Sequence, residues 1–178
     1  MMDFALSFEQ QALVDSLEEF CKRELYPHEA LVEELRHVPE EIRQEIHRKS
    51  VEAGFDNMYV PEEWGGAGLD KQTKMQVERV MGKPHSPLGM CMHRGVTGIL
   101  FKCRDEQVEE YLKPCIRGER KDAFALTEPG AGSDLGLLKT RAEPRGDHYR
   151  LKGQKIFITW GEHDMAANTI HMVLARLP

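Results

Sequence analysis

Long apolar runs, a leader peptide and paired cysteines are all missing from this chain of 178 residues. Because no stretch of about 18 apolar residues occurs, no membrane-spanning helix is expected. The N-terminal stretch MMDFALSFEQ has no basic region followed by an apolar one and is too acidic for a transit peptide, which argues against a secretory or organellar leader. The four cysteines form no CxxC pair, so we expect reduced thiols and no metal site in a cytoplasmic protein.

An excess of basic residues is missing as well. The chain has 24 Lys and Arg residues against 30 Asp and Glu residues, which gives a net charge of -6. This balance argues against a general nucleic-acid or anionic-membrane surface. Hydrophobic residues make up 40% and charged residues 30%, which is ordinary for a soluble globular protein with room for one domain and part of another.

Helical patterns dominate residues 1–119. Ser7 and Gln10 have the spacing of a capping box, which predicts a helix start, and Asp70 can cap a later helix. The segment 90–103 is mostly apolar and predicts a buried central helix, in which small residues let another backbone come close. We expect helices over residues 8–25, 29–35, 39–54, 70–82, 90–103 and 105–118, with a glycine-rich loop over 60–70.

The hydrophobic period changes in residues 120–178, where strands are expected. Residues 123–126 form a short apolar run, and 169–177 is rich in β-branched residues. Apolar residues alternate on both sides of Lys152-Gly153, which predicts a hairpin with its turn there. The predicted fold class is therefore α+β, with an all-helical domain over 1–119 and an incomplete β-sheet or barrel-like domain of about four strands over 120–178.

The segment FALTEPGAGSD, residues 124–134, is the most informative stretch. It places hydroxyls at Thr127 and Ser133 around Gly130 and Gly132, directly after an apolar strand. Glycines let the backbone approach a ligand and leave N–H groups free to meet anionic oxygens. The pattern is neither a GxGxxG fingerprint nor a Walker loop, so the residues alone leave a ligand loop and a structural turn as alternatives.

A second candidate is QKIFITWG, residues 154–161. As a strand it would project Phe157 and Thr159 from one face and Ile156 and Ile158 from the other. Such a strand suits a core on one side and a planar ligand on the other. The alternative is an edge strand in which Phe157 is a core residue.

These segments together resemble the acyl-CoA dehydrogenase family. TEPGAGSD followed by GQKIFIT looks like that family's paired flavin-binding signatures. The stretches LSFEQQAL, EAGF, PEEWGGAGLD and YLKPCIRGER fit its N-terminal half, so the resemblance covers effectively the whole chain.

The resemblance implies FAD-dependent oxidation of an acyl-CoA thioester to the trans-2-enoyl-CoA, by α-proton abstraction and β-hydride transfer to flavin N5. Thr127 is expected near the flavin pyrimidine ring and Thr159 near N5, while Phe157 takes the place of a tryptophan common in the family. Ser133 is also expected to contact substrate. The FAD-contacting residues implied are Phe124, Ala125, Leu126, Thr127, Gly132, Ser133, Phe157, Ile158 and Thr159.

The resemblance also implies what the chain does not carry. The family's catalytic base is a glutamate of a later helical domain, so no catalytic residue is assigned here and Glu128 is assigned to the loop. We expect a fragment that binds FAD weakly or not at all and is inactive alone. Expected partners are an acyl-CoA, an electron-transferring flavoprotein and copies of the chain in a homodimer or homotetramer, in fatty acid metabolism. An acyl-CoA oxidase, a flavin monooxygenase and a truncated non-catalytic packing partner remain alternatives, and the acyl group stays open.

Overall fold

The computed structural model describes residues 5–178, so the first four residues, on which part of the leader interpretation rests, lie outside the described residues. The chain forms two compact units, one ending at Gly95 and one beginning at Val96. A helical N-terminal region is followed by short strands, which confirms the predicted α+β class. The domain boundary between residues 119 and 120 stays a prediction.

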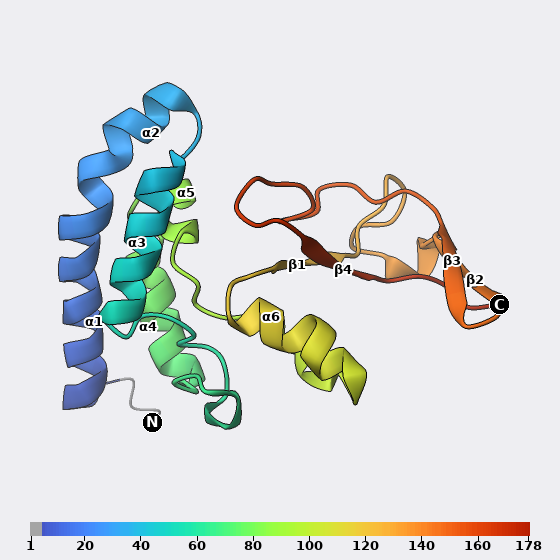
Figure 1. Cartoon of the computed structure of the whole chain (residues 1–178), viewed down its shortest axis with the longest axis horizontal. Helices are drawn as coiled ribbons and strands as arrows, with labels where there is room; N and C mark the ends of the chain where they lie inside the picture. Colours follow the sequence, from blue (N-terminus) through green and yellow to red (C-terminus); the bar gives the residue numbers. More distant parts are fainter. Residues whose placement is uncertain (1–4) are drawn as a thin grey trace. The chain divides into compact units, whose positions relative to one another are not determined.

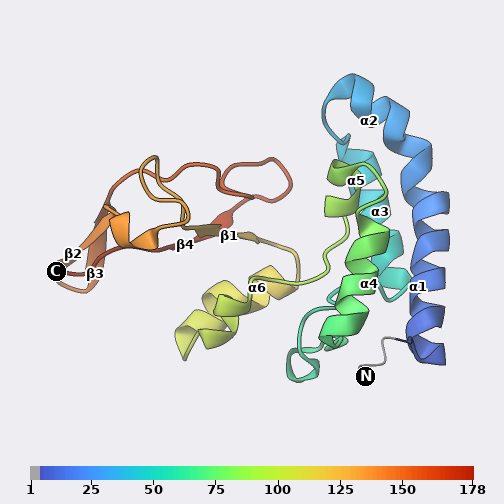
Figure 2. The same ribbon diagram turned by 180° about the vertical axis from the view of Figure 1, so that it is seen from behind.

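The first unit is built from helices that run side by side (Figures 1 and 2). Ser7 caps the first of them: its Oγ accepts the Gln10 N–H at 3.2 Å, and its own N–H donates to Gln10 Oε1 at 2.9 Å, which confirms the capping box. The α-helices are α1 (Phe8–Phe20), α2 (Glu29–Leu35), α3 (Glu40–Glu52), α4 (Lys71–Met81) and α5 (Ser86–Met90). A π-helical turn, Cys21–Leu25, continues α1.

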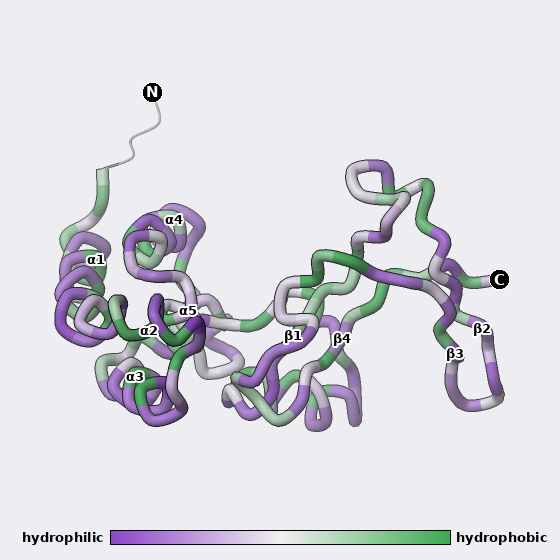
Figure 3. The backbone as a smooth tube through the Cα atoms, turned by 90° about the horizontal axis from the view of Figure 1, so that it is seen from above, coloured by the Kyte–Doolittle hydropathy of each residue, from purple (hydrophilic) through white to green (hydrophobic). Residues whose placement is uncertain are grey.

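One face of each longer helix supplies the core of this unit. Asp70 caps α4 as predicted, because its carboxylate accepts the N–H groups of Gln72 and Thr73. Figure 3 shows hydrophilic and hydrophobic segments interleaved along α1 and α3, as expected for helices with one buried stripe. The fully buried side chains of α1 and α4 include Val14, Leu17, Phe20, Val77 and Val80.

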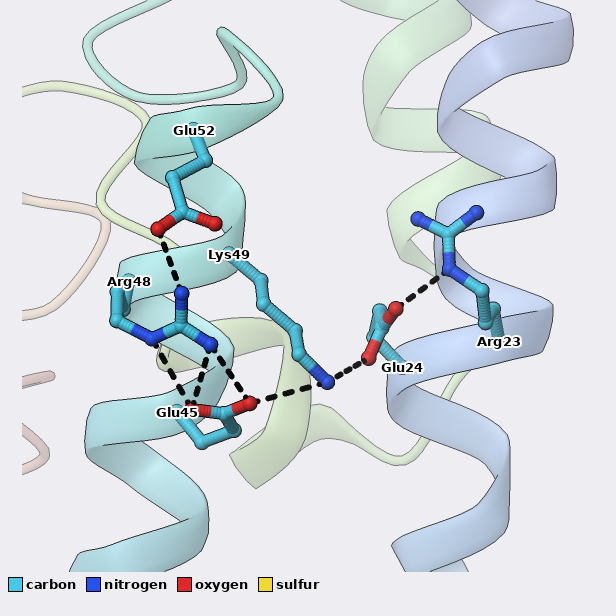
Figure 4. Close-up of polar contacts among 6 residues, drawn as sticks. All are labelled: Arg23, Glu24, Glu45, Arg48, Lys49 and Glu52. Atoms are coloured by element: carbon cyan, nitrogen blue, oxygen red, sulfur yellow. Dashed lines mark hydrogen bonds and ion pairs between the residues drawn. The ribbon is translucent and has the colours of Figure 1, made fainter.

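A polar network joins the α1 extension to α3 (Figure 4). The Glu24 carboxylate is 8% exposed and accepts from Lys49 Nζ at 2.6 Å and from Arg23 Nε at 2.5 Å. Lys49 also pairs with Glu45 at 3.1 Å. Hydrogen bonds from Lys49 and then Arg23 hold the pKa of Glu24 below its usual value against the opposing effect of burial. The network therefore ties two helical segments together through a buried charge.

The predicted central helix over 90–103 is wrong. Helix α5 ends at Met90, residues 91–97 are irregular, and a 3₁₀ segment, Gly98–Lys102, follows. The carbonyls of His93 and Arg94 accept the N–H groups of Asn57 and Tyr59 at 2.8 Å, so this backbone pairs with a distant loop instead of with itself. A Cβ at Gly95 would lie 3.0 Å from Tyr59 Cβ, so the close approach expected of a small residue occurs, but beside an extended backbone.

The second unit contains a short helical segment and two small sheets. Strand β1 (Lys121–Ala125) pairs in parallel with β4 (Thr169–Val173), and β2 (Arg141–Arg145) pairs antiparallel with β3 (His148–Lys152). These positions confirm strands near 123–126 and 169–177. The helical segment consists of a π-helical turn, Val108–Leu112, and α6 (Lys113–Ile116).

No helix within residues 5–178 is long and apolar enough to cross a membrane.

The predicted turn at Lys152-Gly153 is wrong. The hairpin turns at Gly146-Asp147, where Gly146 has φ 68 and Arg145 faces His148 across the ladder. A left-handed backbone favours glycine, which explains the turn. Gly153 serves a different purpose, because a Cβ there would lie 2.2 Å from Thr140 Oγ1. It lets the chain pass close to Thr140 as it leaves β3.

Candidate functional site

The two signature segments meet through their backbones. The Ile156 N–H donates to the carbonyl oxygen of Thr127 at 3.0 Å, and Lys155 Nζ donates to the carbonyl oxygen of Leu126 at 2.8 Å. The glycine-rich segment and the KIFIT segment are thus joined directly after β1.

Glu128 is the electrostatic centre of this junction. Its carboxylate accepts from the N–H of Lys139 at 2.7 Å, from the N–H of Thr140 at 2.9 Å and from Lys155 Nζ at 3.0 Å, and the residue is 6% exposed. Burial raises the pKa of this carboxyl, but the neighbouring Thr140 hydroxyl, these N–H groups and Lys155 outweigh it and lower the pKa to about 2. Glu128 is therefore a fixed anion.

A cavity of about 400 Å³ lies beside the junction. Its lining comprises Ala125, Lys155, Ile156, Phe157, Ile158, Gly161, Glu162, His171 and Val173. The cavity therefore brings together three of the residues expected to contact a flavin: Ala125, Phe157 and Ile158. Lys155, Glu162 and His171 were missed, and only Lys155 carried a signal, since it lies inside the GQKIFIT match.

The other expected contacts do not line this cavity. Phe124 is 44% exposed on the face of β1 opposite Ala125, because neighbouring strand residues alternate. Thr127 is half-buried, whereas Ser133 and Thr159 are exposed. Of the remaining two, Leu126 accepts a hydrogen bond from Lys155 Nζ through its backbone carbonyl, and Gly132 is exposed.

The expected strand over 154–161 is wrong. The backbone turns where Phe157 has φ 56 and Trp160 has φ 61, and the Gly161 N–H donates to the Ile158 carbonyl at 3.0 Å. Left-handed backbone ends a strand, so the predicted alternation of side chains fails and both Phe157 and Ile158 reach the cavity. The alternative of a core phenylalanine is also wrong, because Phe157 is 89% exposed.

The glycine-rich loop is held at its base and open at its tip. Glu128 and Ala131 exchange backbone hydrogen bonds of 2.9 and 3.1 Å, which close a tight turn. A Cβ added at Gly130 or Gly132 would meet nothing within 4 Å, and neither glycine has a positive φ. No contact or backbone strain within the described chain therefore explains these two glycines.

A histidine-centred loop borders the cavity. His163 Nδ1 accepts the Met165 N–H at 3.0 Å, and His163 Nε2 lies 3.0 Å from Thr169 Oγ1. Burial, helped by Lys121, lowers the pKa of His163. His171 Nε2 lies 2.8 Å from the Gly161 carbonyl.

No cluster of three metal-ligating side chains occurs in the part of the chain that the structure describes.

A helical unit followed by a small β unit, with a cavity of about 400 Å³ beside the junction of the two signature segments, defines an α+β protein. The family model "Acyl-CoA dehydrogenase, N-terminal domain" matches residues 7–119, and "Acyl-CoA dehydrogenase, middle domain" matches residues 123–177. The chain belongs to the acyl-CoA dehydrogenase family, as its sequence signatures predicted.

Similar proteins have related names. A Clostridium sporogenes protein named 3-(aryl)acrylate reductase is 40% identical over 163 residues, which are 85% of this chain and 40% of that protein. The caffeyl-CoA reductase-Etf complex subunit CarC of Acetobacterium woodii is 42% identical over 123 residues, which are 67% of this chain and 32% of that protein. The crystal structure of a Bacillus anthracis acyl-CoA dehydrogenase complexed with FAD matches with TM-score 0.74 at 27% identity, covering 99% of this chain and 30% of that one. The chain thus spans less than half the length of these proteins.

Proposed function

We propose that the cavity beside the Thr127–Ile156 junction receives the ring of FAD, in an enzyme that oxidises an acyl-CoA thioester to the trans-2-enoyl-CoA. The observation that carries this proposal is the meeting of the two signature segments at one cavity, through the 3.0 Å bond between Ile156 N–H and Thr127 O. Sequence similarity alone gives no such contact.

The residues present fit a flavin. Ala125, Ile156, Ile158 and Val173 form an apolar lining that suits a planar ring, and the cavity volume lies in the range of small-molecule sites. Phe157 adds an exposed aromatic face. The open space at Gly130 and Gly132 leaves room for a ligand to approach the backbone.

The bound flavin supplies a hydride acceptor and gains negative charge around N1 and O2 when reduced. The chain's own groups orient it. Thr127 and backbone N–H groups of the glycine-rich loop are proposed as donors toward the pyrimidine edge, with Phe124, Leu126, Gly132 and Ser133 as further contacts of the loop. Thr159 is proposed as a donor near N5, and Ser133 also as a contact of the substrate. A fixed set of donors costs no reorganisation when charge develops.

Abstraction of the α-proton is assigned to no residue of this chain. Glu128 is unsuited to it, because a general base works best with a pKa near the working pH, and the pKa of Glu128 is about 2. A base from the part of the family fold beyond these residues remains our proposal.

The wider setting is proposed from the relatives. An Etf complex in the name of the Acetobacterium protein supports an electron-transferring flavoprotein as redox partner. Homo-oligomers and a cytoplasmic location remain proposals. Because two relatives are named reductases, reduction of an aryl enoyl-CoA by the same flavin chemistry is a second candidate direction.

FAD binding is tested by ¹⁵N NMR of the purified chain titrated with FAD to millimolar concentration, which detects weak binding. We expect shifts concentrated in residues 124–133 and 156–161. Shifts spread evenly over the chain would contradict the proposal, and so would a chimera, described next, that binds no FAD. Activity is tested in a chimera that carries this chain in place of the matching stretch of the Clostridium relative: acyl-CoA should bleach the flavin absorbance, and an aryl enoyl-CoA should reoxidise the reduced flavin if the second direction holds.

A further inference from the structure

We propose that the Glu128–Lys155 ion pair is a positioning pair, which holds the backbones of the two signature segments at the spacing that the flavin requires. This inference rests on the proposed function and adds to it two residues that are not assigned a contact with flavin or substrate.

The pair ties together three stretches of chain. Lys155 Nζ donates to Glu128 at 3.0 Å and to the Leu126 carbonyl at 2.8 Å, and Glu128 also accepts two backbone N–H groups from Lys139 and Thr140. Every one of these bonds reaches backbone or the opposite charge, so the pair fixes main-chain positions. The backbone that it fixes includes the groups proposed to meet the flavin.

Burial makes the pair hard to rearrange. The Lys155 side chain is 11% exposed and that of Glu128 is 6% exposed. Removing one partner would leave the other charge buried without compensation, which is far more costly than losing an exposed pair. The spacing between the two segments therefore stays fixed while the pair is intact.

The cavity connects the pair to the ligand. Lys155 is part of its lining, and so are Ala125, next to Leu126, and Ile156, next to Lys155 itself. A shift of the 155–156 backbone would move Phe157 and Ile158, which follow directly. The pair can thus decide whether the walls of the cavity are in place.

Lys155→Met is the principal test, with Lys152→Met as the matched control, because Lys152 is an exposed lysine close by in the same unit. We expect Lys155→Met to speed amide exchange at Thr140 and Ile156 by about tenfold without FAD, and to weaken the FAD-induced NMR shifts at 156–158 about fivefold or more. Lys152→Met should change neither. Lys155→Arg should restore the FAD response, and Glu128→Gln combined with Lys155→Met should add less than the sum of the single effects.

The outcomes separate the two proposals. If neither the unmodified chain nor the chimera responds to FAD, the proposed function fails and the flavin role of the pair fails with it. If the unmodified chain responds and Lys155→Met responds equally, only the positioning role is overturned, whatever the exchange rates do. Amide exchange in β1 and β4 checks that the second unit stays folded, and if Lys155→Met unfolds it, Lys155→Gln is measured in its place with the same expectations.

Discussion

The carbonyl oxygen of Thr127 accepts the backbone N–H of Ile156 at 3.0 Å. This bond sets which residues of the later segment lie beside β1, and it places Phe157 and Ile158 next to Ala125 at the cavity. Directly after the bond the backbone enters the left-handed region at Phe157, with φ 56. An exposed aromatic residue in that conformation is a candidate for a functional constraint, because folding alone gains little from it.

Phe157→Gly is expected to stabilise the chain and weaken FAD binding. Relief of the left-handed conformation should stabilise the folded chain by roughly 1–2 kcal/mol. The added conformational freedom of glycine in the unfolded chain should offset about 0.5–1 kcal/mol of this gain. Thermal unfolding measures the first effect and the NMR titration the second. Phe157→Ala is the control: it removes the ring and keeps the strain, so it should weaken FAD binding without stabilising. A lower unfolding midpoint for Phe157→Gly than for Phe157→Ala would refute this account of the loop.

Two glycines should respond in opposite ways to alanine. At Gly153 a Cβ would lie 2.2 Å from Thr140 Oγ1 and 2.7 Å from its Cα, so Gly153→Ala should cost about 1–3 kcal/mol of stability. At Gly132 a Cβ meets nothing, so Gly132→Ala should stay within about 0.5 kcal/mol and yet weaken the FAD response. Chemical denaturation and the titration are the measurements. If the FAD-induced shifts are unchanged in Gly132→Ala, Gly132 is no longer evidence that this loop binds a ligand.

Sequence patterns that span a few residues correctly predicted the helix caps, because a cap depends on residues that are close in sequence. The Ser7 capping box and the Asp70 cap concern side chains within three residues of the N–H groups that they bind. The predicted central helix failed because the His93 and Arg94 carbonyls bond to Asn57 and Tyr59, a pairing across the fold that no local pattern contains.

The candidate site divides in the same way. Family signatures located the two segments, but the period-two pattern of QKIFIT predicted a strand where Phe157 turns the chain. The role of Glu128 depends on the N–H groups of Lys139 and Thr140, which approach it only in the folded chain. Its partner Lys155 is a surface-type residue by sequence, but its side chain is only 11% exposed in the structure.

In the first unit, Glu24→Gln is expected to lower stability by about 1–3 kcal/mol at neutral pH, because Lys49 and Arg23 lose a charged partner. The folded-state pKa of Glu24 is lowered, so its contribution is present above the unfolded value of about 4.3 and is lost as pH falls through the folded value. Urea unfolding at several pH values tests this. Glu52→Gln, in the same network with a side chain 61% exposed, should change little. Equal effects of the two substitutions would contradict the role given to burial.

In the second unit, Glu128 should stay ionised far below neutral pH. Its folded pKa of about 2 lies under the unfolded value of about 4.3, so the folded chain binds fewer protons and its contribution to stability is complete above the unfolded value. The stability difference between the unmodified chain and Glu128→Gln should therefore hold from pH 7 to about 5, and shrink as the pH falls toward 2. NMR-monitored urea unfolding measures it.

Glu143→Gln is the control for that measurement, because Glu143 is a half-exposed carboxylate of the same unit that forms an ion pair with Arg145. It should show a small difference at every pH. If the Glu128→Gln difference instead stays constant from pH 7 down to about pH 2, the folded and unfolded pKa of the Glu128 carboxyl are equal, and the carboxyl gains a proton near its ordinary value. Glu128 would then not be a fixed anion in the pair with Lys155. A role as general base would also stay open, because a group that titrates closer to neutrality can exchange a proton with substrate.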